Sequence, residues 1–313
     1  MPTLVRAPSR EVRSRIFDSA RWAGYQPRDG DVVIATYPKC GTTWTQRIVG
    51  MLIAGDAAPF AVHGPWFDFR LGPPVEVSLA QAEAVVGRRY LKSHLPYEAL
   101  PVFEGVKFIH VARDGRDSAM SFHNHMRTFT PFARGNADQV SLNDPKFGDA
   151  MPATPEDPAQ FFREWLVDGG ASGDPGASYW EMERSYWDAR HEPNMLLVHY
   201  NDLKADRASE IARIARFLEI DLTPATMHDI VEAAGFEAMK QKGAELMPGA
   251  EMAWEGGYKS FLYKGTNGRW QGVCPEADIA AYKARAAEEF TPGLAAWLEG
   301  GRLAAGDPVT AED

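Results

Sequence analysis

A strand-like run that passes through a glycine-containing turn into a helical pattern constrains the fold of this chain most strongly. Residues 31–36 are apolar and rich in β-branched side chains, and residues 42–54 place apolar side chains at helical spacing. The same order returns at residues 106–111 with 115–125, and at residues 195–200 with 209–218. Repeated strand-then-helix units predict an α/β fold with a central parallel sheet flanked by helices.

The length and composition indicate a single domain. The chain has 313 residues, is 45% hydrophobic, and shows no Ser/Gly linker that would divide it. We expect one domain over residues 1–313 with its core at about residues 31–290. Residues 128–158 are rich in Pro, Gly, Asn and Asp and predict a long surface loop. The residues after Pro292 predict a flexible C-terminal tail.

The net charge and the cysteine content limit the classes of binding partner and the cellular compartments that fit this chain. A formal net charge of −10 argues against binding to nucleic acid or to an anionic membrane surface. Cys40 and Cys274 are too few for a disulfide framework, and the N-terminal residues lack the apolar core of a signal peptide. Since no apolar run is long enough to cross a membrane, we expect a soluble, cytoplasmic protein without integral membrane association.

The turn after the first strand has the properties of an anion site. It reads Thr-Tyr-Pro-Lys-Cys-Gly-Thr-Thr-Trp over residues 36–44. Gly41 lets the backbone approach a ligand closely, and the following helix N-terminus favours an anion. Lys39 adds a positive charge, and Thr42 and Thr43 add hydroxyl donors. These features predict a P-loop-like phosphate-binding loop at the carboxyl end of a strand.

Other interpretations of this turn remain open at the level of its residues. The spacing G-x-x-x-x-G-K-[ST] of nucleotide triphosphatases is missing from it. The Lys-x-Gly-Thr-Thr stretch also fits an ordinary helix cap. Trp44 fits either a core position or a platform on which a base stacks.

A second anion motif follows the strand at residues 106–111. Arg113 comes directly after this strand, and Ser121 comes eight residues later in the next helical pattern. An arginine offers paired planar donors to a phosphate, and a serine can add one more. The alternative is that Arg113 simply pairs with Asp117.

These motifs together resemble the cytosolic-type sulfotransferases, which use 3′-phosphoadenosine-5′-phosphosulfate (PAPS). Residues 37–44 are similar to the family's 5′-phosphosulfate loop, with Cys40 in place of a serine. The pair Arg113 and Ser121 resembles its 3′-phosphate motif. The segment that begins at Tyr200 resembles its Tyr-Glu-Asp-Met segment, whose tyrosine lies near the adenine. The resemblance runs in the family's order from about residue 31 to residue 275.

Two further segments carry the resemblance towards the C-terminus. Residues 235–239 resemble the family's Ser-Phe-x-x-Met segment, and residues 263–270 resemble the RKGxxGDW motif that closes over the 3′-phosphate. Tyr263 stands where the motif has arginine, and Arg269 stands where it has aspartate. We hypothesise that Arg269 or Lys264 partly replaces the missing arginine. The family's dimer motif is not present, so the oligomeric state stays undetermined.

The resemblance implies a donor site without a metal ion and a catalytic histidine. PAPS would be the co-substrate, and adenosine 3′,5′-bisphosphate (PAP) the product. The residues implied to bind the donor are Lys39, Cys40, Gly41, Thr42, Thr43, Trp44, Arg113, Ser121, Tyr200, Phe236, Met239, Phe261, Leu262, Lys264, Gly265 and Arg269.

The catalytic element implied by the resemblance is Lys-Ser-His-Leu-Pro at residues 92–96, similar to the family's K-T-H-L-P. His94 would be the base that accepts the proton of the acceptor hydroxyl. Lys39 and Lys92 would neutralise developing negative charge, and Ser121 would tether Lys39. Taken alone, a single histidine also fits a structural polar residue.

The acceptor side is less defined by the sequence. The aromatic residues Trp66, Phe67 and Phe69 resemble the family's acceptor segment and would line an apolar pocket, although an aromatic cluster also fits a core. The predicted function is transfer of a sulfuryl group from PAPS to a hydroxyl of a small molecule, lipid or natural product. The alternatives are a P-loop-type kinase and a non-catalytic nucleotide-binding protein.

Overall fold

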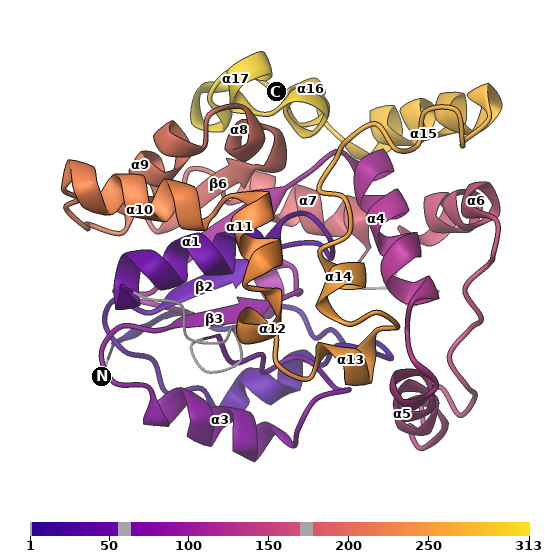
Figure 1. The fold of residues 1–313 in the computed structure, drawn as a ribbon, viewed down its shortest axis with the longest axis horizontal. Helices are drawn as coiled ribbons and strands as arrows, with labels where there is room; N and C mark the ends of the chain where they lie inside the picture. The colour runs from indigo at the N-terminus through magenta and orange to yellow at the C-terminus, as the bar shows by residue number, and fades with distance from the viewer. Residues whose placement is uncertain (1, 56–63, 170–177) are drawn as a thin grey trace.

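The apolar runs of the sequence form a four-stranded parallel sheet at the centre of the molecule (Figure 1). The computed structural model describes residues 2–55, 64–169 and 178–313. The strand order is β3-β2-β5-β6. These strands comprise β2 Val32–Ala35, β3 Tyr90–Ser93, β5 Lys107–Ala112 and β6 Met195–His199. Because all neighbouring pairs are parallel, the four carboxyl ends lie at one edge of the sheet.

A helix follows each of three strands, as predicted. These are α1 Thr42–Ala54 after β2, α4 Gly115–Arg127 after β5, and α8 Tyr200–Ala205 with α9 Arg207–Phe217 after β6. A small antiparallel pair joins β1 Leu4–Arg6 to β4 Val102–Phe103.

The remaining helical segments cover the sheet and its carboxyl edge. Before β5 they are η1 Ser19–Gly24, α3 Val75–Ala84 and η2 Tyr97–Ala99. Between α4 and β6 they are α5 Pro131–Leu142, α6 Pro158–Asp168 and α7 Tyr179–Asp188. After α9 they are α10 Pro224–Ala233, α11 Phe236–Gln241, α12 Gly243–Leu246, α13 Ala250–Ala253, α14 Tyr258–Phe261, α15 Glu276–Glu289, α16 Pro292–Gly300, α17 Arg302–Ala305 and η3 Pro308–Thr310.

Hydrophobic side chains are buried on both faces of the sheet. Val32 and Ile34 of β2 pack with α1, α9 and α10 on one face. Val33 and Ala35 point to the opposite face, where α4, α6, α7 and α16 contribute the other cluster. Because β2 is covered on both faces, all four of its residues are buried, as in α/β folds generally. No described helix is long and apolar enough to cross a membrane.

The long loop predicted at residues 128–158 is wrong in its first half, because α5 occupies Pro131–Leu142. Thr130 caps this helix by accepting the N–H of Ala133, and Pro131 fits the first helical turn. The Thr130 N–H also donates to the Ala253 carbonyl oxygen at 3.0 Å. Figure 1 shows α5 beside α13, which confirms that the start of this segment is fastened to a distant part of the chain.

The predicted flexible C-terminal tail is also wrong. Residues after Pro292 form α16, α17 and η3, and Leu294, Trp297 and Leu298 are buried against the core. The last residue, Asp313, accepts a hydrogen bond from Arg190 at 2.6 Å. The Gly-rich and acidic composition of the tail hid these apolar anchors.

Candidate active site

The carboxyl ends of all four parallel strands open into one cavity of about 480 Å³. Lys39 follows β2, His94 follows β3, Arg113 follows β5 and Tyr200 follows β6, and all four line this cavity. A volume of this size is typical of a small-molecule site. The fold therefore brings residues from four distant parts of the sequence into one place.

Most of the residues predicted for the site lie on the wall of this cavity. On the donor side these are Lys39, Gly41, Thr42, Thr43, Trp44, Arg113, Ser121, Tyr200, Phe236, Met239, Phe261, Leu262, Lys264, Gly265 and Arg269. Lys92, His94, Trp66 and Phe69 also line it.

Cys40 and Phe67 are the two predicted residues that the structure places elsewhere. Cys40 is fully buried in the core, its Sγ lies 3.5 Å from Ser118 Oγ, and its N–H donates to the Tyr37 carbonyl oxygen. Burial raises the pKa of this thiol, which makes it a poor nucleophile. The ring of Phe67 is buried against Trp22 rather than facing the cavity. Both were expected to contact a ligand, and neither side chain lines the cavity.

The loop before α1 has an unusual backbone that exposes the helix N-terminus. Lys39 adopts a φ of 70° and Gly41 a φ of 117°. The positive φ at position 41 favours glycine, and a Cβ there would also make a tight contact of 3.1 Å with the ring of Tyr200. No side chain caps α1. Its first-turn amides are therefore available to an anion.

Positive side chains gather around this helix terminus. Lys39, Lys92, Arg113 and Arg269 all line the cavity. Burial, followed by the charges of Lys92, Arg113 and Arg269, lowers the pKa of Lys39 to about 7. Burial also lowers the pKa of Lys92 to about 7, against the opposing effect of Asp68. A bound anion would raise both pKa values, because a nearby negative charge favours the protonated form of each lysine.

Arg113 joins the loop before α1 to the segment after α14. Its Nη2 donates to the Thr266 carbonyl oxygen at 3.0 Å and to Asn267 Oδ1 at 2.8 Å, and its Nη1 donates to the Lys39 carbonyl oxygen at 3.2 Å. The guanidinium lies 4.2 Å above the ring centroid of Tyr200. Stacking and hydrogen bonds hold the guanidinium plane in one orientation beside the cavity.

His94 is held as a neutral base by its surroundings. Its Nδ1 lies 2.5 Å from the Thr36 carbonyl oxygen. Because a carbonyl oxygen can only accept, Nδ1 carries the proton and Nε2 keeps a free lone pair. Burial lowers the pKa of His94 well below 6.5, and the charges of Lys92 and Lys39 lower it further, while the Thr36 hydrogen bond opposes them. The main-chain N–H of His94 donates to Asp68 Oδ2 at 3.0 Å and fixes the residue in place.

An aromatic wall begins beside His94. The Lys92 ammonium lies 3.5 Å from the ring centroid of Trp66, and Trp66 stacks on Phe69 with centroids 4.0 Å apart. From there the cavity wall is mainly apolar and contains Ile16, Phe17, Leu71, Phe122, Met126, Phe129, Phe132, Ala133, Met252, Ala253 and Trp254. The cavity thus has a cationic half at α1 and an apolar half beyond His94.

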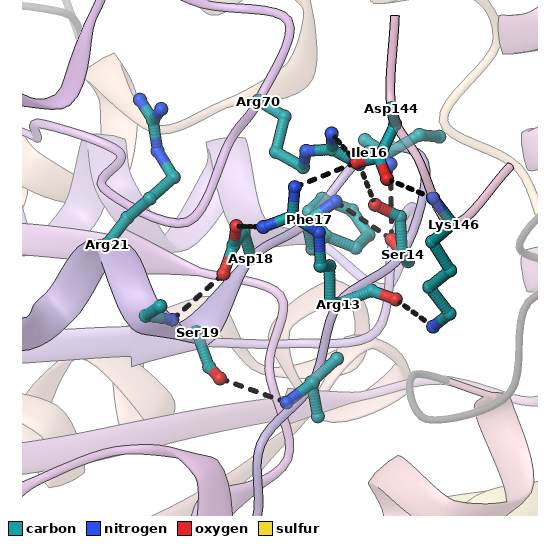
Figure 2. Close-up of polar contacts among 12 residues, drawn as sticks. Arg13, Ser14, Ile16, Phe17, Asp18, Ser19, Arg21, Arg70, Asp144 and Lys146 are labelled. Carbon is teal, nitrogen blue, oxygen red and sulfur yellow. Dashed lines mark hydrogen bonds and ion pairs between the residues drawn. The ribbon is translucent and has the colours of Figure 1, made fainter. Parts of the chain in front are cut away.

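Part of this apolar wall is fastened by the polar network in Figure 2. Asp144 is almost fully buried, accepts a hydrogen bond from Arg13 at 2.9 Å and pairs with Arg70. The N–H of Arg70 in turn donates to the Ile16 carbonyl oxygen at 2.8 Å. The network ties the segment that carries Ile16 and Phe17 to the turn that follows α5.

Sequence reasoning missed most of the apolar wall, and it also missed His125 and Trp254. His125 Nδ1 lies 3.5 Å from Lys39 Nζ, the position at which Ser121 was expected to act. A signal for His125 was present, since it lies four residues after Ser121 and therefore on the same face of α4. No comparable pattern marks Trp254.

No group of three or more His, Cys, Asp or Glu within the described ranges could hold a metal ion.

Residues 29–291 match a family model described as a sulfotransferase domain. A glycolipid sulfotransferase of Mycobacterium bovis (strain BCG) is 31% identical over 313 residues, covering 93% of this chain and 94% of that protein.

Two more distant proteins show the same likeness. Sulfotransferase 1A1 of Rattus norvegicus is 29% identical over 273 residues, covering 83% of this chain and 84% of that protein. A crystal structure of a mouse sulfotransferase complexed with PAP superposes with a TM-score of 0.64, at 19% identity, covering 87% of this chain and 88% of that one. Its fold is the fold described here.

Proposed function

This chain belongs to the sulfotransferase family, and we propose on that basis which residues bind the donor, move the proton and select the acceptor. It is a PAPS-dependent enzyme that transfers a sulfuryl group to a hydroxyl acceptor. The family match therefore favours a sulfotransferase over the two alternatives considered from the sequence, a P-loop-type kinase and a non-catalytic nucleotide-binding protein.

The cationic half of the cavity fits PAPS. The uncapped N-terminus of α1 and Lys39 would hold the 5′-phosphosulfate, and Arg113 with Ser121 would hold the 3′-phosphate. Trp44, Tyr200 and Phe236, which also line the cavity, would contact the adenine. Two observations support this fit: a Cβ at position 41 would lie 3.1 Å from the ring of Tyr200, and burial, followed by the charges of Lys92, Arg113 and Arg269, lowers the pKa of Lys39 to about 7.

Lys264 and Arg269 together supply the charge that Tyr263 does not. Each lies with its charged group 5.1 Å from the Tyr263 ring centroid, and both line the cavity. The charge of Arg269 also lowers the pKa of Lys39, which supports a place for it in the same electrostatic cluster. No metal ion is part of this proposed donor site.

His94 accepts the proton of the acceptor hydroxyl on Nε2. PAPS, when bound, supplies the sulfuryl group and leaves as PAP. The Thr36 carbonyl oxygen keeps the Nδ1 proton in place and stabilises the imidazolium that forms. Lys39 and Lys92, whose charges both act on His94, provide the positive charge that stabilises the departing phosphate and the transferred group.

The acceptor is a hydroxyl compound with an elongated apolar body, such as a lipid. The observation that carries this proposal is the apolar half of the cavity, which runs from the Trp66 and Phe69 stack to a rim where Phe132 is 65% and Met252 56% exposed. Large exposed apolar side chains at a cavity mouth mark a site for an apolar ligand. The name of the mycobacterial relative, a glycolipid sulfotransferase, supports a lipid-like acceptor.

A series of para-alkylphenols from methyl to octyl tests the proposed acceptor class. Each methylene that becomes buried contributes about 0.8 kcal/mol, so kcat/KM should rise about fourfold per carbon until the chain passes the rim. The measurement is initial-rate sulfation with saturating PAPS. A flat series, or a better rate with a free sugar, would contradict an apolar acceptor.

A matched pair of variants locates the binding surface. Phe132→Ser should lower kcat/KM for octylphenol and leave methylphenol unchanged, because only the longer chain reaches the rim. Val86→Ser is the control, since Val86 is 97% exposed and does not line the cavity. Equal losses in the two variants would place the alkyl chain elsewhere.

A further inference from the structure

Lys39 extends to a histidine that does not belong to the phosphate loop. Its Nζ lies 3.5 Å from His125 Nδ1 on α4 and 4.0 Å from the ring centroid of Phe261 on α14. Because an ammonium group can only donate, Nδ1 is the acceptor in this contact. The aromatic face adds a second attraction for the same charge.

The His125 ring is itself confined by aromatic neighbours. Its centroid lies 5.3 Å from Phe129, 5.1 Å from Trp254 and 5.6 Å from Phe261. Phe129 and Trp254 are joined by a backbone bridge, so two segments far apart in the sequence close on the ring together. This packing leaves the nitrogen next to Lys39 in a defined position.

The charge state of His125 suits an acceptor role. Burial lowers its pKa well below 6.5, and the nearby charges of Lys39 and Lys92 lower it further. The ring is therefore neutral at pH 7. Phe129, Trp254 and Phe261, the aromatic side chains packed on it, do not titrate.

We infer that His125 is a positioning residue that holds the Lys39 ammonium at the boundary between the donor half and the acceptor half of the cavity. The inference rests on the proposed role of Lys39 in stabilising the transferred group. A lysine has four rotatable side-chain bonds, and catalysis by a point charge depends on where that charge sits. His125 and Phe261 restrict the ammonium to one side of the cavity before a substrate arrives.

The test compares His125→Phe, which keeps a planar ring but removes the nitrogen, with His125→Asn, which restores an acceptor near Nδ1. Loss of a hydrogen bond to a charged group predicts a kcat lowered roughly tenfold to a hundredfold in His125→Phe. We expect an unchanged acceptor KM in that variant. His125→Asn should recover most of kcat.

A pH profile separates positioning from a structural effect. The kcat/KM for PAPS reports the free enzyme and should fall as pH rises through the pKa of Lys39, about 7, because the lysine must be protonated. In His125→Phe this fall moves to lower pH, since an apolar ring replaces an acceptor beside the ammonium. Lys92, His94, Arg113 and Arg269 face Lys39 equally in both proteins.

The control is His123→Phe on the same helix. His123 Nε2 lies 2.9 Å from the Pro155 carbonyl oxygen, outside the cavity wall, so its replacement should leave kcat and the pH profile unchanged. The inference would be overturned if His125→Phe had the kcat of the parent enzyme and if its kcat/KM for PAPS fell at the same pH as in the parent. Full loss in His125→Asn together with an active His94→Ala would overturn it too, by making His125 the base. Parent kcat in Lys39→Ala would instead overturn the proposed role of Lys39 itself.

Discussion

Replacement of His94 by alanine lowers kcat by roughly two to four orders of magnitude, the range expected when a general base is removed. The expectation follows from the bond between Nδ1 and the Thr36 carbonyl oxygen, which leaves Nε2 as the proton acceptor inside the cavity. Initial-rate sulfation with saturating PAPS and acceptor measures it. Binding of PAP should be unchanged, because the ring is not part of the proposed donor contacts.

A second variant and a pH profile sharpen this result. His94→Asn can still donate to the Thr36 carbonyl oxygen but has no basic nitrogen, so it should be as inactive as the alanine variant. In the parent enzyme kcat should stay flat at neutral pH and fall only as pH drops through a pKa held well below 6.5, where His94 becomes protonated. An active asparagine variant would show that His94 only positions its neighbours.

Replacement of Arg113 by methionine weakens PAP binding by roughly tenfold to more than a hundredfold, because a hydrogen bond from a charged donor contributes about 1.5–3 kcal/mol. The guanidinium is held in place by Tyr200 and by the 266–267 segment, so its positive charge has a fixed position beside the proposed 3′-phosphate site. Isothermal titration measures the loss. Adenosine 5′-monophosphate, which lacks the 3′-phosphate, should bind almost equally to parent and variant.

Titration with adenosine 5′-monophosphate also detects a general loss of structure in the donor site of the Arg113 variant. Since Arg113 donates to Thr266 and to Lys39 as well, its loss could loosen the whole donor site. That effect would weaken both nucleotides to the same degree, and it would contradict a specific role in 3′-phosphate binding. Arg127→Met is the matched control, because Arg127 ends α4, the helix that begins two residues after Arg113, and pairs with Glu156 at the surface.

The local elements of this fold could be predicted because their signals lie within a few residues. The β-branched run of residues 31–36 became β2 at Val32–Ala35, and the helical pattern that follows became α1 with the predicted bounds. The turn at residues 36–44 joins β2 to α1. Its lysine and glycine must therefore lie where the strand ends and the helix begins. The sequence for that reason placed Lys39 and Gly41 at the carboxyl end of a strand, and both line the cavity.

The errors concern features that distant contacts decide. Phe67 is one residue from Trp66, yet its ring is buried against Trp22 while Trp66 faces the cavity. Composition suggested a loop where α5 forms, and the contact of Thr130 with the Ala253 backbone, which fastens the start of this helix, is not visible as a pattern. His125 became part of the site only because α4 and α14 both pack beside Lys39.

The most direct test of the donor site is titration of the metal-free protein with PAP, adenosine 5′-monophosphate and ATP. The cationic half of the cavity predicts that PAP binds at least about a hundredfold more tightly than the monophosphate, since the 3′-phosphate adds charge-assisted hydrogen bonds. It also predicts that ATP, with or without magnesium, binds more weakly than PAP. Equal affinity for PAP and the monophosphate, or tighter binding of ATP with magnesium, would contradict the proposed donor site.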